Sequence, residues 1–246
     1  MSSERYELKF PMHVSQKQRV VALARQGLVE DSHGTNAAYR VSSTYFDTPD
    51  LRAYREKLDG EAIRRKFRLR YYSVEGSKGP AVGSAFMEIK RRAGNVGHKD
   101  RILLTDAGAE AILSDAAELT RLHQHVAPQA RGMVPQIQEV EHAAATTRLQ
   151  AALVITYWRE AWEGSVDHRL RVTFDTRCEA LTPHRYLDVT SGAGKPILAP
   201  SQCIMEVKFN SVIPRWIRDV VTNEHIQLRR FSKYAAGVEA LGLASK

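Results

Sequence analysis

Cysteine is scarce in this sequence, and long apolar runs are missing. Its 246 residues include only Cys178 and Cys203, which form no C-x-x-C pair. Two thiols in a chain of this size favour a reducing compartment over a disulfide framework. No apolar run approaches the roughly 18 residues that a membrane-spanning helix needs, and the opening MSSERYELKF lacks the hydrophobic region of a secretory signal. We therefore expect a soluble, cytoplasmic protein.

The familiar metal and nucleotide motifs are missing too. The nine histidines are scattered, without an H-E-x-x-H or a His/Cys cluster, so a zinc site is disfavoured. Neither G-x-x-x-x-G-K-[ST] nor a strand followed by G-x-G-x-x-G occurs, which excludes a P-loop or a Rossmann site. SGAGKP (191–196) has only half of such a motif, and we interpret it as a loop. Any bound phosphate would have to be held by side-chain charge.

Positive charge is what the sequence has in excess. Lysine and arginine number 36 against 28 acidic residues, for a formal net charge of +8. This excess indicates an anionic partner, which could be nucleic acid, an anionic membrane or a polyanionic small molecule. With 43% hydrophobic residues the chain can bury a sizeable core. A length of 246 fits one domain, because β-barrels commonly run to roughly 200–250 residues as a single unit.

The cations follow a strand-like alternation, which is clearest in RRKFRLRYY (64–72). Successive side chains of a strand point to opposite faces. One face carries Arg64, Lys66, Arg68 and Arg70, and the other carries Arg65, Phe67, Leu69 and Tyr71. A row of cations cannot be core, so that face meets either water or an anion.

The same alternation recurs in other segments, which favours the anion. It groups Glu7 with Lys9, Phe86 with Glu88, Lys90 and Arg92, Lys99 with Arg101, Tyr157 with Arg159, Arg169 with Arg171, and Glu206 with Lys208. Several such strands facing inward predict a barrel with a basic lumen. A nucleic-acid surface is disfavoured, because the cations spread over seven strands and alternate with glutamates.

Carboxylates among the cations suit a hard metal ion that is partly ligated by substrate phosphates, such as Mn²⁺ or Mg²⁺. Glu206 is the best single ligand candidate, and Glu88 and Glu7 come next. The alternative is that each glutamate only neutralises a nearby lysine.

The helices and strands are predicted from hydrophobic periodicity and from the turn residues that bound each segment. We predict strands at 4–10 (ended by Pro11), 39–46, 64–73, 86–92, 98–104, 151–162, 167–175 and 201–210. We predict helices from Ser15 to Leu28, over 51–60, within 105–150, from Pro214 onward and over 229–243. The chain 1–246 reads as one domain, in which 105–150 is a helical insertion that carries no functional signal.

Together the segments resemble a known family. RYELKF, STYFDT, FRLRYY, MEIKRR followed by K-D-R, YWREAW with LRVTFDT, IMEVKFN and FSKY are similar, in order and over Tyr6 to about Gly237, to the VTC domain. This is the polyphosphate-polymerase domain of the triphosphate tunnel metalloenzyme (CYTH-like) superfamily.

The resemblance implies an α+β fold, with an antiparallel eight-stranded β-barrel tunnel and peripheral helices. It implies transfer of the γ-phosphoryl group of ATP to inorganic polyphosphate, with Mn²⁺ or Mg²⁺. The phosphate-contacting positions fall on Lys9, Arg68, Arg70, Lys90, Arg159, Arg171 and Lys233, with Lys99 and Arg101 as additions. Glu206 falls on the metal position, Tyr157 and Ser232 lie beside the substrate, and Glu7, Glu88 and Lys208 complete the expected substrate-binding set.

One departure bears on the mechanism. The superfamily opens with E-x-E-x-K, whereas Arg5 replaces the first glutamate here. One metal-binding carboxylate is therefore missing, which suits the VTC branch and makes a two-metal hydrolytic site less certain. A triphosphate or polyphosphate hydrolase and a non-catalytic polyphosphate or nucleotide sensor remain alternatives. The resemblance extends to eukaryotic relatives that are tethered to a membrane complex. We expect no such tether within this sequence, and recruitment by a membrane-protein partner stays open, as does the oligomeric state.

Overall fold

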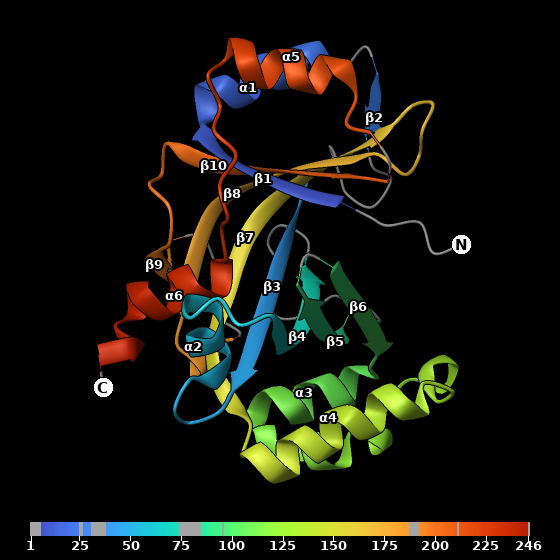
Figure 1. The fold of residues 1–246 in the computed structure, drawn as a ribbon. Helices are drawn as coiled ribbons and strands as arrows, with labels where there is room; N and C mark the ends of the chain where they lie inside the picture. The colour runs from blue at the N-terminus through green and yellow to red at the C-terminus, as the bar shows by residue number, and fades with distance from the viewer. Residues whose placement is uncertain are drawn as a thin grey trace. The chain divides into compact units, whose positions relative to one another are not determined.

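The structure, a computed structural model, describes residues 6–24, 27–30, 38–73, 85–94, 96–186, 192–210 and 212–245. Its centre is an antiparallel sheet with the strand order β1-β10-β8-β7-β3-β4-β5-β6, to which β2 adds beside β7 and β9 beside β8 (Figure 1). The strands are β1 (Tyr6–His13), β2 (Leu28–Glu30), β3 (Ala38–Asp47), β4 (Ile63–Ser73), β5 (Phe86–Ala93), β6 (Val96–Leu103), β7 (Gln150–Gly164), β8 (Arg171–Leu181), β9 (Lys195–Pro196) and β10 (Gln202–Phe209).

The described chain also contains α-helices and short 3-10 helices. They are α1 (Val14–Ala24), α2 (Arg52–Leu58), α3 (Asp106–Ser114), η1 (Ala116–Gln124), η2 (Pro128–Ala130), α4 (Val134–Thr147), η3 (Pro183–Arg185), α5 (Arg215–Asn223), α6 (Lys233–Leu241) and η4 (Leu243–Ser245). The predicted α+β class with an antiparallel sheet is confirmed. Eight strands form the main path, as expected, and among the described strands the sheet is not closed. None of the helices in the described ranges combines the length and the apolar character that a bilayer crossing requires.

The described chain divides into two compact units. The first takes residues from 1–40, 157–178 and 198–232, and the second from 41–156, 179–197 and 233–246. The strands β7 and β8 contribute to both units. That 1–246 is a single domain stays a prediction.

In the first unit, one face of the sheet is apolar. Phe10, Met205, Val207 and Phe174 belong to one buried cluster with Val20 of α1 and Ile217 of α5. The two helices lie together over this face of β1 and β10 (Figure 1). Because strand side chains alternate, the opposite face of the same strands is left to the charged residues.

The sheet of the second unit also has one apolar face and one charged face. Phe67, Leu69 and Tyr71 of β4 and Met87 and Ile89 of β5 are buried against the helices of 105–150. These helices contribute Ile112, Leu119, Leu122 and Val140 to the same core. The segment that carried no functional signal therefore covers the apolar face of β4, β5 and β6.

Prolines set several boundaries differently from the prediction. Pro11 does not end the first strand but pairs with Ile204 inside β1. β1 ends the strand order, and an edge strand tolerates a residue that has no N–H to donate. Pro128 and Pro135, within the segment predicted as helical, each lie in the first turn of a helix, where the missing N–H costs little.

Three other boundaries were wrong. Leu28 belongs to β2 and not to the helix before it, which ends at Ala24. Arg169 precedes β8 and pairs with Asp167 at the surface, so it does not share a strand face with Arg171. The last helix begins at Lys233 and leaves 229–232 non-helical.

The contact of α3 with η1 yields a test of the helical layer. A Cβ added at Gly108 would lie 2.6 Å from the His125 carbonyl oxygen and 2.8 Å from its Cα, which are backbone atoms that cannot rotate away. We expect G108A to destabilise the protein by about 1–3 kcal/mol in urea unfolding. Gly132 has no atom within 4 Å of such a Cβ, so G132A should be neutral or slightly stabilising. Equal midpoints for the two variants would contradict the packing described.

Candidate phosphate-binding faces

The second unit brings five charged residues of the candidate set together. Register places Arg68 of β4 opposite Glu88 of β5, and Glu88 opposite Arg101 of β6. Arg70 and Lys99 lie one step away on the same face, at even spacing. We name Glu88, Arg68, Arg70, Lys99 and Arg101 the Glu88 cluster.

Glu88 is the centre of this cluster. Its Oε2 lies 2.6 Å from Arg68 Nη2 and 3.9 Å from Arg70 Nε. Its Oε1 lies 2.8 Å from Arg101 Nη2 and 3.5 Å from Lys99 Nζ. The carboxylate is completely buried, whereas Arg101 and Lys99 are 35% and 42% exposed. Glu88 therefore pairs with these cations from the buried side, and Arg101 and Lys99 stay partly accessible.

The ionisation of Glu88 follows from these neighbours. Burial by itself would raise its pKa, but Arg68, Arg70, Lys99 and Arg101 outweigh burial and hold the pKa of Glu88 far below its ordinary range. One negative charge thus faces four positive ones, and the cluster keeps a net positive charge.

Hydroxyl groups orient the arginines further. Tyr45 Oη accepts a hydrogen bond of 2.9 Å from Arg68, and Ser43 Oγ accepts one of 3.2 Å from Arg70. Both acceptors come from β3 and share its face with Asp47. Tyr72 Oη accepts from Arg101 at 3.0 Å.

Tyr45 and Lys66 are electrostatically unusual. Burial would raise the pKa of Tyr45, but Arg68, Arg70 and Lys66 lower it to about 8. Burial lowers the pKa of Lys66 to about 8, and Lys90 and Arg64 add to this effect. The Tyr234 ring lies against both, 4.9 Å from the Tyr45 ring and 5.1 Å from Lys66 Nζ. Tyr234 itself donates to the buried Asp47 at 2.5 Å.

The first unit carries a second charged face, on the side of its sheet opposite the apolar cluster. Lys9 of β1 is the register partner of Glu206 of β10, and Glu7 is the partner of Lys208. Lys208 Nζ lies 2.6 Å from Glu206 Oε1, and Lys9 Nζ lies 2.9 Å from Glu7 Oε1. The cross pairs, Lys9 with Glu206 and Lys208 with Glu7, are both at 3.9 Å. We name these four residues the Glu206 cluster.

Arg159 and Arg171 lie in the same unit and are held differently. Arg159 makes two hydrogen bonds, of 2.7 and 2.8 Å, to the fully buried carboxylate of Asp175. Burial would lower the pKa of Arg159, but Asp175 outweighs it and raises that pKa, with a smaller contribution from Glu206. Arg171 donates to Tyr39 Oη at 3.3 Å and lies 3.5 Å from Glu163 Oε1. Arg159 is thus fixed by a buried carboxylate.

The remaining predicted residues are placed as follows. Tyr157 is buried on β7, with Arg159 lying over its ring at 5.2 Å. Lys90 is exposed on β5, between register partners Lys66 and Lys99. Ser232 directly precedes α6, and Lys233 is its first residue. Arg5 lies outside the described residues.

Two residues that matter here were not in the predicted set. Asp175 shares the face of Arg171 four residues along β8, and Tyr45 sits between Ser43 and Asp47 in alternation. Both could have been found by continuing the same alternation along LRVTFDT and STYFDT.

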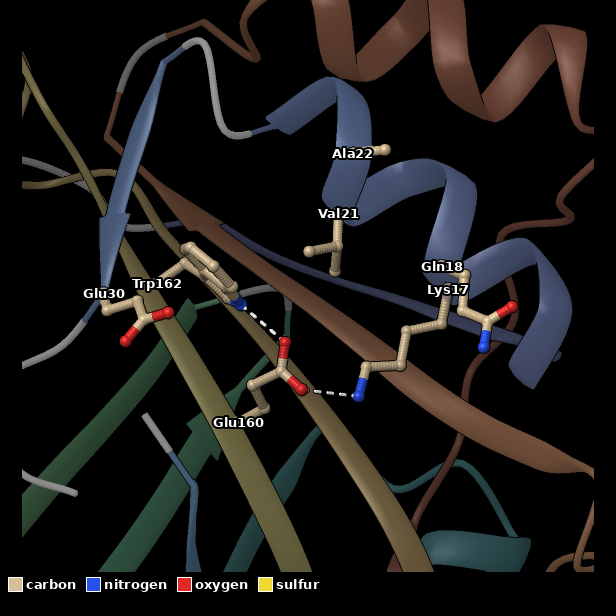
Figure 2. A pocket seen from close by; sticks show the side chains of 7 residues that line it. All are labelled: Lys17, Gln18, Val21, Ala22, Glu30, Glu160 and Trp162. Atoms are coloured by element: carbon tan, nitrogen blue, oxygen red, sulfur yellow. Dashed lines mark hydrogen bonds and ion pairs between the residues drawn. The ribbon is translucent and has the colours of Figure 1, made fainter. Parts of the chain in front are cut away.

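A pocket elsewhere in the first unit does not contain any of these residues. A pocket of about 440 Å³ is lined by Lys17, Gln18, Val21, Ala22, Glu30, Glu160 and Trp162. Figure 2 shows Glu160 accepting from Trp162 and pairing with Lys17. Glu160 and Trp162 alternate with Arg159 on β7 and therefore point to the opposite face. With two carboxylates and one lysine, this pocket is not suited to phosphate.

The comparison with protein families identifies the chain. A family profile for the VTC domain matches residues 4–242. The chain belongs to the VTC domain family. The resemblance drawn from the sequence motifs is confirmed, and the match covers both charged faces. No curated protein matches the sequence.

Solved structures are similar in fold. A Hippeastrum protein named as an adenylyl cyclase and described as having a dominant triphosphatase activity has a TM-score of 0.55 at 13% identity, over 96% of this chain and 94% of that one. A Bacillus halodurans protein named as an adenylate cyclase has a TM-score of 0.49 at 8% identity, over 94% of each chain. The Mimivirus capping enzyme triphosphatase has 0.39 at 8% identity, over 90% and 88%. The first of these shows that the VTC chain shares its fold.

Replacement of Glu88 tests the role of the buried carboxylate. We expect E88Q to lower the free energy of unfolding by about 3–5 kcal/mol, because four cations lose a completely buried partner. The pKa of Glu88 is depressed in the fold, so its contribution is present above the unfolded-chain value of about 4.3 and is lost as the pH falls. The difference between E88Q and the parent protein should therefore shrink in acid. The exposed Glu110 of α3 provides the control, since E110Q should stay within about 0.5 kcal/mol; an equally mild E88Q would contradict the cluster.

Tyr45 gives a spectroscopic prediction. In the folded protein one tyrosine should ionise near pH 8, seen in ultraviolet absorbance, and Y45F should remove that step. Between about pH 8 and the unfolded-chain value of about 10, the unfolded chain holds a proton that the folded chain has released. The stability of the parent protein should therefore rise with pH across this window relative to Y45F. R68Q should move the ionisation back toward higher pH; a first tyrosine ionisation near pH 10 in the parent would refute the assignment.

Proposed function

We propose that this VTC-domain protein is a metal-dependent polyphosphate polymerase, which transfers the γ-phosphoryl group of ATP to inorganic polyphosphate. The observation that carries the proposal is the convergence of Arg68, Arg70, Lys99 and Arg101 on one buried carboxylate, in a chain of the VTC family. A guanidinium group that is already held in one orientation can bind two phosphate oxygens at once. Such a surface suits a substrate that carries many phosphate charges.

Phosphoryl transfer depends on positioning and on charge stabilisation more than on covalent chemistry by the protein. In our proposal a terminal oxygen of the polyphosphate chain attacks the γ-phosphorus of ATP, and ADP leaves. Phosphate oxygens are bound by Lys9, Arg68, Arg70, Lys90, Arg159, Arg171, Lys233, Lys99 and Arg101. Tyr157, Ser232, Glu7, Glu88 and Lys208 complete the binding surfaces around them.

The few carboxylates on the charged faces suit a divalent cation for which the substrate would supply most of the ligands. No group of three or more His, Cys, Asp or Glu side chains in the described ranges could hold a metal on its own. Glu206 is 8% exposed, and its carboxylate pairs with the ammonium groups of Lys208 and Lys9. We propose that Glu206 holds Mn²⁺ or Mg²⁺, with phosphate oxygens and water as further ligands. When bound, the metal would neutralise charge that develops on the phosphate oxygens.

Hydrolysis is the second candidate. A Hippeastrum protein of the same fold is described as having a dominant triphosphatase activity. If water replaces the polyphosphate oxygen as the attacking group, the same cations would support triphosphate or polyphosphate hydrolysis. A sensor that binds without turnover is the third alternative.

The products separate the three functions. Purified protein is incubated with ATP and Mn²⁺, and phosphate is followed as long chains, as free phosphate, or as neither while binding persists. Long chains support the polymerase, free phosphate supports the hydrolase, and binding without turnover supports the sensor. Absence of both binding and turnover would refute all three.

K90A gives the matched test of the cationic face. Because Lys90 is exposed, its replacement should leave the unfolding midpoint nearly unchanged, while turnover falls by about 100-fold or more. The control is R215A, which removes a cation that is 86% exposed on α5, the helix that covers the apolar face. R215A should retain activity; a K90A protein with full activity would contradict the assignment.

A further inference from the structure

One hydroxyl on the charged face of the first unit has no structural explanation. Thr173 of β8 is 2% exposed, and among the described residues its Oγ1 has no hydrogen-bond partner. Buried polar side chains are nearly always hydrogen-bonded, so an exception requires a reason. Its strand neighbours Val172 and Phe174 point into the apolar cluster, so the Thr173 side chain points to the other face.

The strand register places this hydroxyl beside the proposed metal ligand. Thr173 is the direct cross-strand partner of Glu206, and such pairs have Cβ atoms about 4.5–5.5 Å apart. Arg171 and Asp175 flank Thr173 on the same face of β8. The Thr173 hydroxyl thus lies beside the Glu206 carboxylate. Along β8 it is flanked by Arg171 and by Asp175, the partner of Arg159.

The chemistry of that position points to a hard cation. Hydroxyl and carboxylate oxygens are the donors that Mg²⁺ and Mn²⁺ prefer, and a threonine hydroxyl ligates Mg²⁺ in phosphate-loop enzymes. Asp175 is not available for this role, because both of its oxygens accept from Arg159. Valine would fill the same strand position equally well if only shape mattered.

We propose that Thr173 Oγ1 is a second protein oxygen ligand, beside Glu206, of the divalent cation that accompanies condensed phosphate. This inference rests on the proposed function. It assigns a role to a residue outside the site set predicted from the sequence.

The test uses binding and not turnover. Mn²⁺ is titrated into the full chain by electron paramagnetic resonance, in the presence of inorganic tripolyphosphate. We expect T173V, which replaces the hydroxyl by a methyl group, to weaken Mn²⁺ binding by about tenfold. T173S, which keeps the hydroxyl, should bind as the parent does. The unfolding midpoint of T173V without ligand should not fall, because the lost hydroxyl makes no hydrogen bond; should T173V fail to fold, T173A provides the same comparison.

Thr44 provides the matched control. Its hydroxyl is also buried without a partner among the described residues, but on β3 it alternates with Ser43 and Tyr45, so it points away from the cations. T44V should leave Mn²⁺ binding unchanged. Unchanged binding in T173V, or equal weakening in T173V and T44V, overturns the inference while the proposed function stands. A parent protein that binds neither tripolyphosphate nor Mn²⁺ overturns both.

Discussion

Buried carboxylates hold the cationic side chains of this protein in place. Glu88 and Asp175 are each completely inaccessible to solvent, and each binds a guanidinium group at 2.6–2.8 Å. A charge in such an environment persists only when it is paired. Each carboxylate therefore requires its arginine, and the arginine in turn is fixed in one orientation. Preorganised donors of this kind need no rearrangement when a polyanion binds.

The alternation of strand side chains makes this arrangement compatible with a stable fold. Phe67, Leu69 and Tyr71 of β4 enter the apolar core, while Arg68 and Arg70 lie on the other face. The same division separates Phe174 from Thr173 and Asp175 in β8. Helices then cover the apolar faces. One sheet thus carries both the wall of a core and the charged face that we propose as a binding surface.

The carboxylates of the charged faces are paired with two kinds of cation. Around Glu88 and Asp175, planar guanidinium groups make several hydrogen bonds each, which fixes direction as well as distance. Glu206 pairs with the ammonium groups of Lys208 and Lys9, on flexible stems and at 2.6 and 3.9 Å. A lysine ammonium on a flexible stem can change partners at lower cost than a bidentate guanidinium. This property of the lysine pairs supports the proposal of a divalent ion at Glu206 over one at Glu88.

The sequence by itself determined which residues share a strand face, because period-two alternation depends only on chain order. Arg68 with Arg70, Glu7 with Lys9 and Glu206 with Lys208 are therefore grouped by their spacing alone, and ordered motifs such as RYELKF and IMEVKFN indicated the family. Only the tertiary structure decided which strands are neighbours, since pairing joins residues far apart in the chain. It revealed that Glu88 binds Arg101 as well as Arg68, that Asp175 holds Arg159, and that Thr173 lies opposite Glu206. The prediction that Pro11 ends the first strand was wrong for the same reason. Pro11 is tolerated because its strand lies at an edge of the sheet, and edge position is a property of the assembled sheet.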